Sequence, residues 1–260
     1  MRYFPQLETN TAGQYPLRRK RTERVVPVDS LDGRRLTYYD GAAAQVEWAL
    51  HYEGLTDTER EAVSALFFAC EGRLLTFVLL DPAANLLRWS EDFSQSAWTV
   101  GPLVSVSGGA ADPWTTTRAS AIANGGAATA AVAQTIGAPG ALQYCLSAWV
   151  KGAGALRIDS GGVIVEKNFA TGAEWQRVHV SGKPNSAAET VTFSLRVAPS
   201  ATVSVVGMQA EAQVAPGGYK TTTSRAGVYP NARFAKDEMA WTMQAPNNNA
   251  AVIRIISRSN

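Results

Sequence analysis

The fold of the opening segment is decided by residues 45–82, which read QVEWALHYEGLTDTEREAVSALFFACEGRLLTFVLLDP. From Val46 to Tyr52, apolar and polar side chains alternate, which is the period-2 pattern of a half-buried strand. The spacing then changes to i, i+3, i+4 and i+7, which is typical of an amphipathic helix. The residues at that spacing are Val63, Leu66, Phe67 and Cys70. The apolar run Leu74–Leu80 predicts a second, buried strand that ends before Asp81 and Pro82.

The predicted helix spans Leu55–Gly72 and carries its own start and stop signals. Thr56 is placed to cap the N-terminus, and Glu59 follows three residues later as a capping-box partner. Gly72 suits the left-handed position beyond the last turn. Cys70 lies on the apolar stripe, so we expect it to be a small buried group rather than a reactive thiol.

Composition excludes several classes of protein. The chain has 260 residues, of which 46% are hydrophobic and 18% are charged, with two cysteines and two histidines. No apolar run reaches the ~18 residues that a membrane helix needs, and the first residues lack the apolar core of a signal peptide. Cys70 and Cys145 stand far apart and form no CxxC motif, which argues against a disulfide scaffold or a zinc site. We therefore expect no metal and no cofactor.

Charge is segregated along the opening segment. Residues 1–35 carry a net charge of +4, and residues 36–85 carry −6. The basic cluster comprises Arg18, Arg19, Lys20, Arg21 and Arg24, with Arg34 and Arg35 further on. The acidic run comprises Glu47, Glu53, Asp57, Glu59 and Glu61. In a homo-oligomer a basic patch on one copy can face an acidic patch on the next, so both sets are candidate residues for an interface between copies. A nucleic-acid footprint and a solvated loop remain as alternatives for the basic cluster.

The middle of the chain, residues 85–224, is poor in charge and rich in short strand-like runs. These are Leu103–Ser107, Ala128–Ile136, Leu142–Val150, Gly162–Phe169, Trp175–Ser181, Thr190–Val197 and Thr202–Ala212. Glycine- and proline-containing turns separate them, and such spacing predicts an antiparallel β-sandwich.

The last segment, residues 225–260, predicts a hairpin of Met239–Gln244 and Ala251–Ser257 around a turn at Pro246. Two strands alone are marginal in water, so the hairpin needs an existing sheet. The arrangement we expect is one discontinuous domain of residues 1–84 and 225–260, with 85–224 inserted as a separate β unit. The fold class is therefore mainly β with one helix.

The opening segment resembles the N-terminal module of distal tail proteins of tailed bacteriophages. The resemblance rests on Val46-Glu47-Trp48, on Phe67–Arg73, and on the ordered set Gly72-Arg73, Phe77 and Asp81. It implies a β-sandwich or barrel tail domain that forms a ring, usually a hexamer. Such a ring joins the tail tube to the tail-tip hub, and DNA can pass through its lumen.

The middle segment is similar to carbohydrate-binding-like modules that occur in phage virion proteins. The matching stretches, in order, are Asn85–Ser94, Ser147–Lys151, Trp175–Val178, Gly207–Glu211 and Gly218-Tyr219. This resemblance implies a jelly roll, or galactose-binding-like sandwich. Inserted modules of this kind are a known layout in distal tail proteins, so the two resemblances support each other.

A sugar site needs exposed aromatic faces and planar polar side chains, and the carbohydrate-binding candidates are Trp114, Trp149, Trp175 and Tyr144. Core packing is the competing explanation for each of them. Trp114 follows Asp112-Pro113 on an expected loop and is the best single candidate. No hydrolase triad, paired-carboxylate or nucleotide-binding motif stands out, so we expect no catalytic residues and no enzyme.

The sequence thus predicts a structural protein of the phage tail, made in the host cytoplasm and incorporated into the virion. Its partners would be other copies of itself, the tail tube protein, the tail-tip hub and, through the insertion, a host surface polysaccharide. A tail-tube or tail-terminator subunit and a stand-alone carbohydrate-binding protein remain as alternatives.

Overall fold

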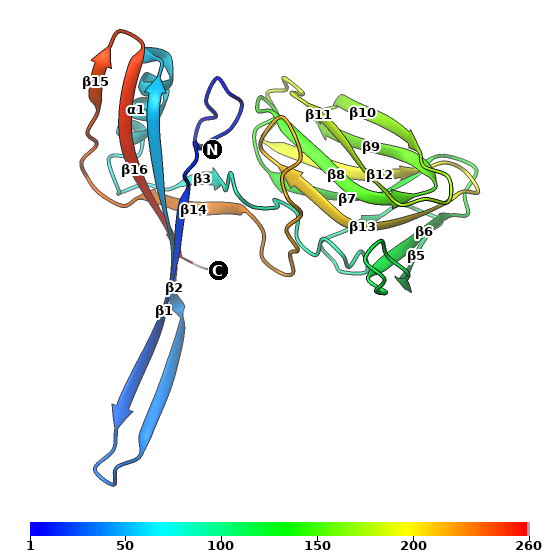
Figure 1. Cartoon of the computed structure of the whole chain (residues 1–260), viewed down its shortest axis with the longest axis horizontal. Coiled ribbons are helices and arrows are strands. Elements are labelled where there is room, and N and C mark those ends of the chain that lie inside the picture. The colour runs from blue at the N-terminus through cyan, green and yellow to red at the C-terminus, as the bar shows by residue number, and fades with distance from the viewer. Residues whose placement is uncertain (259–260) are drawn as a thin grey trace. The chain divides into compact units, whose positions relative to one another are not determined.

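The computed structural model describes residues 1–258, and the chain divides into two compact units (Figure 1). Unit 1 contains Met1–Glu8, Gly13–Leu79 and the chain from Tyr229 onward, and unit 2 contains Thr9–Ala12 and Leu80–Val228. The structure is mainly β with one helix, which confirms the fold class expected from the sequence. Within the described residues, no helix is long and apolar enough to cross a membrane.

Unit 1 is built on one six-stranded sheet. Its order is β1 (Arg18–Asp29), β2 (Arg35–Leu55), β16 (Asn248–Arg258), β14 (Val228–Phe234) and β3 (Phe77–Leu80), and β15 (Thr242–Ala245) pairs with β16. β16 runs antiparallel to β2, from Asn249 opposite Leu55 to Arg258 opposite Gln45. The C-terminal strand therefore lies in the same sheet as the opening segment. The predicted hairpin near the C-terminus is present as β15 and β16.

The period-2 pattern of the opening segment is confirmed. Val46, Trp48, Leu50 and Tyr52 are almost fully buried on one face of β2. On the same face, β16 places Ile253 opposite Leu50 and Ile255 opposite Trp48. The fully buried indole of Trp48 makes an edge contact with the ring of Tyr229, with 4.6 Å between centroids. This face is the core of unit 1.

The helix α1 (Asp57–Ala69) begins at the predicted cap. The Glu59 amide donates to the Thr56 hydroxyl at 3.2 Å, and the Thr56 amide donates to the Glu59 carboxylate at 2.8 Å, so the capping box is complete. Cys70 is fully buried, and Gly72 has the left-handed φ of 65°. The strand predicted over Leu74–Leu80 is shorter than expected, because Leu74 lies in a turn and is exposed while β3 begins at Phe77.

Unit 2 contains two five-stranded antiparallel sheets (Figure 1). The first sheet has the order β10 (Val163–Ala170), β9 (Ala153–Ser160), β12 (Thr190–Val197), β7 (Ala130–Gly137) and β4 (Thr99–Val100). The second has the order β11 (Gln176–Gly182), β8 (Tyr144–Lys151), β13 (Thr202–Glu211), β6 (Ala119–Asn124) and β5 (Val104–Ala110). All seven predicted runs are strands, whereas β4, β6 and β9 were not predicted. The buried side chains include Ile122, Leu146, Leu156, Ile158, Phe193, Leu195 and Val205.

Candidate functional site

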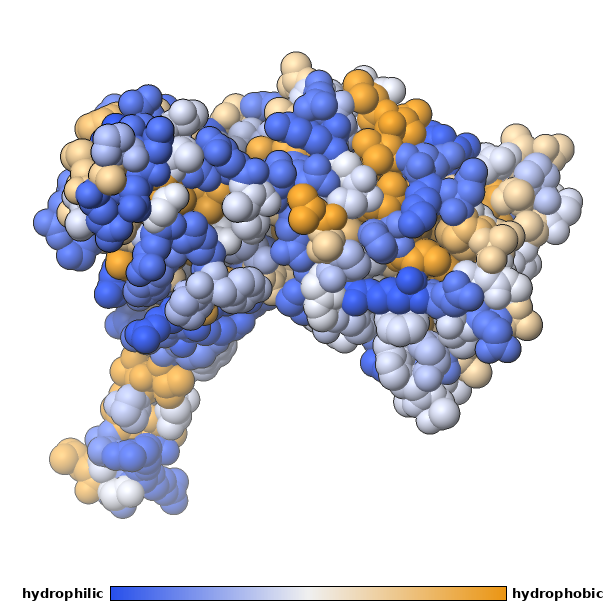
Figure 2. Space-filling view, turned by 45° about the horizontal axis from the view of Figure 1, so that its top comes forward, coloured by the Kyte–Doolittle hydropathy of each residue, from blue (hydrophilic) through white to orange (hydrophobic). Residues whose placement is uncertain are grey.

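The first candidate site is a two-stranded ribbon of residues 24–40, here called the arm, which extends from unit 1 (Figure 1). It consists of the end of β1, the turn that follows, and the beginning of β2. Val26 is opposite Tyr38, and Val28 is opposite Leu36. Every residue of β1 is exposed. The exposed apolar side chains of the arm are Val25, Val26, Val28, Leu31, Leu36, Tyr38 and Tyr39. Figure 2 shows hydrophobic and hydrophilic patches along it.

The arm exposes apolar side chains to water and is not covered by the rest of unit 1. A two-stranded ribbon is marginally stable in water, and clustered apolar surface marks a site of interaction. The Leu31 side chain at the tip is fully exposed, and the ring of Tyr39 is 63% exposed. The arrangement suits a surface that another polypeptide covers.

The basic cluster of β1 does not form one free patch. Arg24 pairs with Asp40 at 3.4 Å, and Arg21 pairs with Glu23 on its own strand. The Arg19 guanidinium lies over the Trp48 ring, 5.8 Å from its centroid, and contacts Tyr229 as well. Arg34 and Arg35 near the tip pair with Asp32 and Asp29. In the described part of the chain, Arg18 and Lys20 are the two members of this cluster whose side chains have no ionic or hydrogen-bonding partner.

The acidic run is divided between β2 and α1. Glu47 pairs with Arg254 at 3.2 Å, and Glu53 is exposed. On the helix, Asp57 accepts a hydrogen bond from Asn249 at 3.0 Å, and Glu61 lies 3.5 Å from Arg60. Glu59 is a correction to the predicted interface: it is buried, and its carboxylate accepts from the amides of Thr56 and Glu8. A carboxylate that is buried and bonded to these two amides cannot form an ion pair with another copy of the chain.

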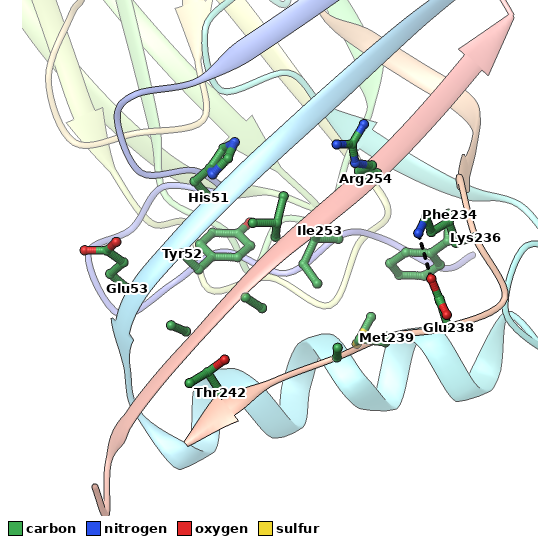
Figure 3. A pocket seen from close by; sticks show the side chains of 14 residues that line it. His51, Tyr52, Glu53, Phe234, Lys236, Glu238, Met239, Thr242, Ile253 and Arg254 are labelled. Atoms are coloured by element: carbon green, nitrogen blue, oxygen red, sulfur yellow. Dashed lines mark hydrogen bonds and ion pairs between the residues drawn. The ribbon is translucent and has the colours of Figure 1, made fainter. Parts of the chain in front are cut away.

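A groove of about 560 Å³ lies beside β16 in unit 1, and the sequence did not predict it (Figure 3). Apolar lining comes from Tyr52, Phe234, Met239 and Ile253. Charged side chains at the groove are Glu53, Lys236, Glu238 and Arg254, and Lys236 pairs with Glu238 at 2.7 Å. Its residues come from β2, β14, β15, β16 and the link before β15, so only the assembled sheet brings them together.

The second candidate site is an aromatic cluster in unit 2. The Trp114 ring is 37% exposed and stacks on Tyr219, with 6.0 Å between centroids and an 11° interplanar angle. Its other aromatic neighbour is Trp149, which it meets edge-on at 5.5 Å. The Arg118 guanidinium lies 4.9 Å from the Trp114 centroid, a cation–π distance. Trp114 is thus partly exposed, with Tyr219 stacked on its ring and Arg118 over it, and its role as a sugar contact stays a prediction.

The loop that carries Trp114 is fixed by Asp112. Its buried carboxylate accepts from the amides of Trp114 and Thr116, both at 2.9 Å, and pairs with Arg118 at 3.3 Å. Burial acts to raise the pKa of Asp112, but the hydrogen bonds from Thr116, Trp114 and Arg118 outweigh it and hold that pKa well below its usual range. Trp114 is thus held by a network that stays ionised.

Tyr219 holds the other side of the stack and was not among the predicted site residues. Its hydroxyl donates to Glu91 at 2.9 Å and lies 3.0 Å from the Ser90 hydroxyl. The ring packs over Gly207, where an added Cβ would lie 3.0 Å from it, and Gly207 has a φ of 67°. The sequence signal was present, since Gly218-Tyr219 follows the closing strand of the resembled module.

Of the other predicted sugar-binding residues, Trp149 and Trp175 lie on the outer side of the sheet and Tyr144 lies in the core. Trp149 on β8 is opposite Arg177 on β11, and Trp175, two residues earlier, projects to the same side. Both indoles are partly exposed. Tyr144 is a correction: it is fully buried, packs on Phe193 and donates its hydroxyl to the Pro139 carbonyl at 2.7 Å. It therefore belongs to the sandwich core and cannot contact a sugar.

Chemically reactive groups in unit 2 are held in structural roles. Glu211 is buried and pairs with Lys220 at 3.0 Å, and Glu166 lies between Arg157 and Arg196. Burial raises the pKa of the Cys145 thiol to about 12. No group of three or more histidine, cysteine or carboxylate side chains that could hold a metal ion occurs among residues 1–258.

Comparison with known proteins gave matches only among solved structures. No family model matches the chain, and no curated protein sequence matches it. A similar structure is the enzymatically active domain of bacteriophage CBA120 tailspike protein 4, with 15% identity over 51% of this chain and 21% of that one, and a TM-score of 0.39. This chain therefore spans only about a fifth of that protein.

Several carbohydrate-binding modules are also similar. One is TmCBM61, solved in complex with β-1,4-galactotriose, with 18% identity over 48% of this chain and 97% of the module, and a TM-score of 0.35. Another is the CBM22-1 xylan-binding domain of Paenibacillus barcinonensis Xyn10C, with 11% identity over 55% of this chain and 98% of the module, and a TM-score of 0.39.

Proposed function

We propose that the chain is a structural subunit of a phage tail that assembles into a closed ring at the distal end through the arm. The supporting observation is the arm itself, a two-stranded ribbon with seven exposed apolar side chains. By the resemblance of residues 45–82 the ring has six copies and joins the tail tube to the tip hub, with DNA passing through its lumen. The protein is made in the host cytoplasm and becomes part of the virion.

A closed heterologous ring needs two different surfaces on each copy. The arm is the far part of β1 and β2, residues 24–40, while the groove is lined by His51–Glu53 of β2 together with residues of β14, β15 and β16. These surfaces differ in shape and position, which favours head-to-tail closure over a two-fold dimer. The arginine and aspartate side chains of the arm pair with one another on its exposed surface. Its apolar side chains would therefore supply most of the free energy of association between copies.

Electron microscopy of the purified full chain tests this assembly, and a uniform ring is the expected particle. Quantitative mass spectrometry of virions then separates a distal ring from a tube subunit, because a tube subunit repeats along the whole tail. A copy number per virion equal to the number of subunits in one ring supports the proposal. A copy number equal to that of the tube protein would assign the chain to the tube instead.

A second function, glycan binding by unit 2, is favoured by the partly exposed and rigidly held Trp114. Indole faces stack on sugar rings, and neighbouring polar side chains bond to hydroxyls. A glycan array of host surface polysaccharides tests it, with Trp114→Ala expected to lose the signal. Leu103→Ala, another exposed apolar side chain of unit 2, is the matched control. An array without any signal would leave unit 2 as a spacer.

A further inference from the structure

The outer face of β8 and β11 combines indole rings with basic side chains. Arg177 is opposite Trp149, and Trp175 and Lys151 follow on the same side of the two strands. The Lys151 ammonium lies 5.7 Å from the centroid of the Trp175 ring. His179, two residues beyond Arg177, is exposed on this side as well. We call Lys151, Trp149, Trp175, Arg177 and His179 the basic face.

The two strands of the basic face carry no acidic side chain, and on the neighbouring strand β13 the buried Glu211, opposite Cys145, is already paired with Lys220 at 3.0 Å. The strands β8 (YCLSAWVK) and β11 (QRVHVSG) contain neither aspartate nor glutamate. The Arg177 guanidinium donates to the Ser147 hydroxyl at 3.1 Å, and no carboxylate pairs with it among the described residues. By contrast, Arg118 and Arg157 of the same unit both have carboxylate partners. Arg177 therefore keeps most of its five N–H donors for another acceptor.

Trp149 adds another unused donor. Its indole N–H is buried and has no hydrogen-bond partner within the described structure. A buried unsatisfied donor is costly, and native proteins usually satisfy it with protein, water or ligand. The partly exposed indole beside the unpaired Arg177 thus places an apolar stacking surface next to a cation that lacks its counter-ion.

We propose that the basic face binds an acidic polysaccharide, with the indoles of Trp149 and Trp175 stacking on sugar rings and Arg177 binding a sugar carboxylate. This inference rests on the proposed glycan-binding function and names its ligand class. A guanidinium binds a carboxylate through two parallel hydrogen bonds, which gives geometric selectivity as well as attraction. Uronic acids offer a pyranose ring and a carboxylate in one unit, and neutral glycans offer only the ring.

The test is affinity electrophoresis of the full chain in gels that contain polygalacturonate, an acidic polymer, or dextran, a neutral one. We expect retardation by polygalacturonate that weakens with salt, and little by dextran. Arg177→Gln is expected to weaken polygalacturonate binding by roughly tenfold or more, the size of a lost hydrogen bond to a charged group. Arg177→Lys keeps the charge but not the two-bond geometry, so an intermediate loss is expected.

The matched control is Lys167→Gln, which removes the same charge from exposed β10 in the other sheet. It is expected to bind as the wild type does, and thermal melting checks that all variants fold. Equal losses in Arg177→Gln and Lys167→Gln would overturn the proposal in favour of unspecific charge attraction. Equal Arg177-dependent binding of single-stranded DNA would overturn it in favour of a nucleic-acid site.

Failure of the ligand class differs from failure of glycan binding itself. If dextran or other neutral glycans retard the chain as strongly as polygalacturonate, the acidic class is wrong while glycan binding stands. If no polysaccharide retards it and the glycan array is also blank, both proposals fail together.

Discussion

A double substitution in the arm, Val26→Asp with Leu36→Asp, is expected to break the assembly without unfolding the chain. Both side chains project from one face of the ribbon, beside Tyr38 and Val28, their cross-strand partners. They are exposed in the single chain, by 38% for Val26 and 52% for Leu36, so their replacement removes little from the folded subunit. Any large effect must therefore come from what covers them.

The size of the effect follows from these exposures. Fully burying a valine or leucine side chain contributes ~1.5–3 kcal/mol. The four side chains of this face are between 38% and 58% exposed, so covering them contributes ~3–6 kcal/mol per interface. The double variant loses about half of this and adds the cost of desolvating two carboxylates. Each interface should weaken by at least about tenfold.

The assay is size-exclusion chromatography with light scattering over a wide range of protein concentration. The wild type should elute as one assembly, and the arm variant as a monomer at concentrations where the wild type stays assembled. Val163→Asp with Val214→Asp, two comparably exposed valines of unit 2, is the control and should remain assembled. An arm variant that assembles like the control would refute the role of the arm.

Three further predictions concern stability and reactivity. Thr56→Ala removes the N-cap hydroxyl of α1 and should lower the free energy of unfolding by about 1 kcal/mol in a urea titration; an unchanged midpoint would argue against the capping box. Arg157 and a second arginine hold the pKa of Glu166 below its ordinary value of 4.5, so its stabilisation is fully present above about pH 4.5 and is lost as pH falls through the depressed pKa. Glu166→Gln should therefore lose less stability than the wild type between neutral pH and pH ~3, and parallel losses would contradict this. Finally, Cys70 and Cys145 are buried and their thiol pKa values are raised. A thiol reagent should therefore react with both thiols only after the chain is denatured. Fast reaction in the folded chain would contradict their burial.

Local chemistry made the core of unit 1 predictable. The alternation from Val46 to Tyr52 and the Thr56–Glu59 box depend on neighbours within a few residues, and both occur as expected. Strand β1 was missed because its side chains are exposed on both faces, so Arg18–Asp29 shows no period-2 pattern. Its basic residues drew attention to charge, whereas the structure pairs most of them locally.

The candidate sites were only partly predictable. Trp175 and Arg177 are two residues apart on a predicted strand, so their common face could be inferred from the sequence. The stack of Trp114 on Tyr219 joins residues far apart in the chain, and no sequence period encodes it. Tyr144 was misplaced because alternation identifies the two faces of a strand but not which of them meets the core. Glu59 was misplaced for a different reason, because its carboxylate also accepts from the amide of Glu8, 51 residues away, and no local pattern encodes that contact.

The most direct test of the central proposal is a cryo-electron-microscopy reconstruction of the particle that the full chain forms. We predict a closed ring in which each arm lies against the neighbouring copy and the side chains of Val26 and Leu36 are buried there. Arms that project freely into solvent, or a chain that stays monomeric at every concentration, would contradict the proposal.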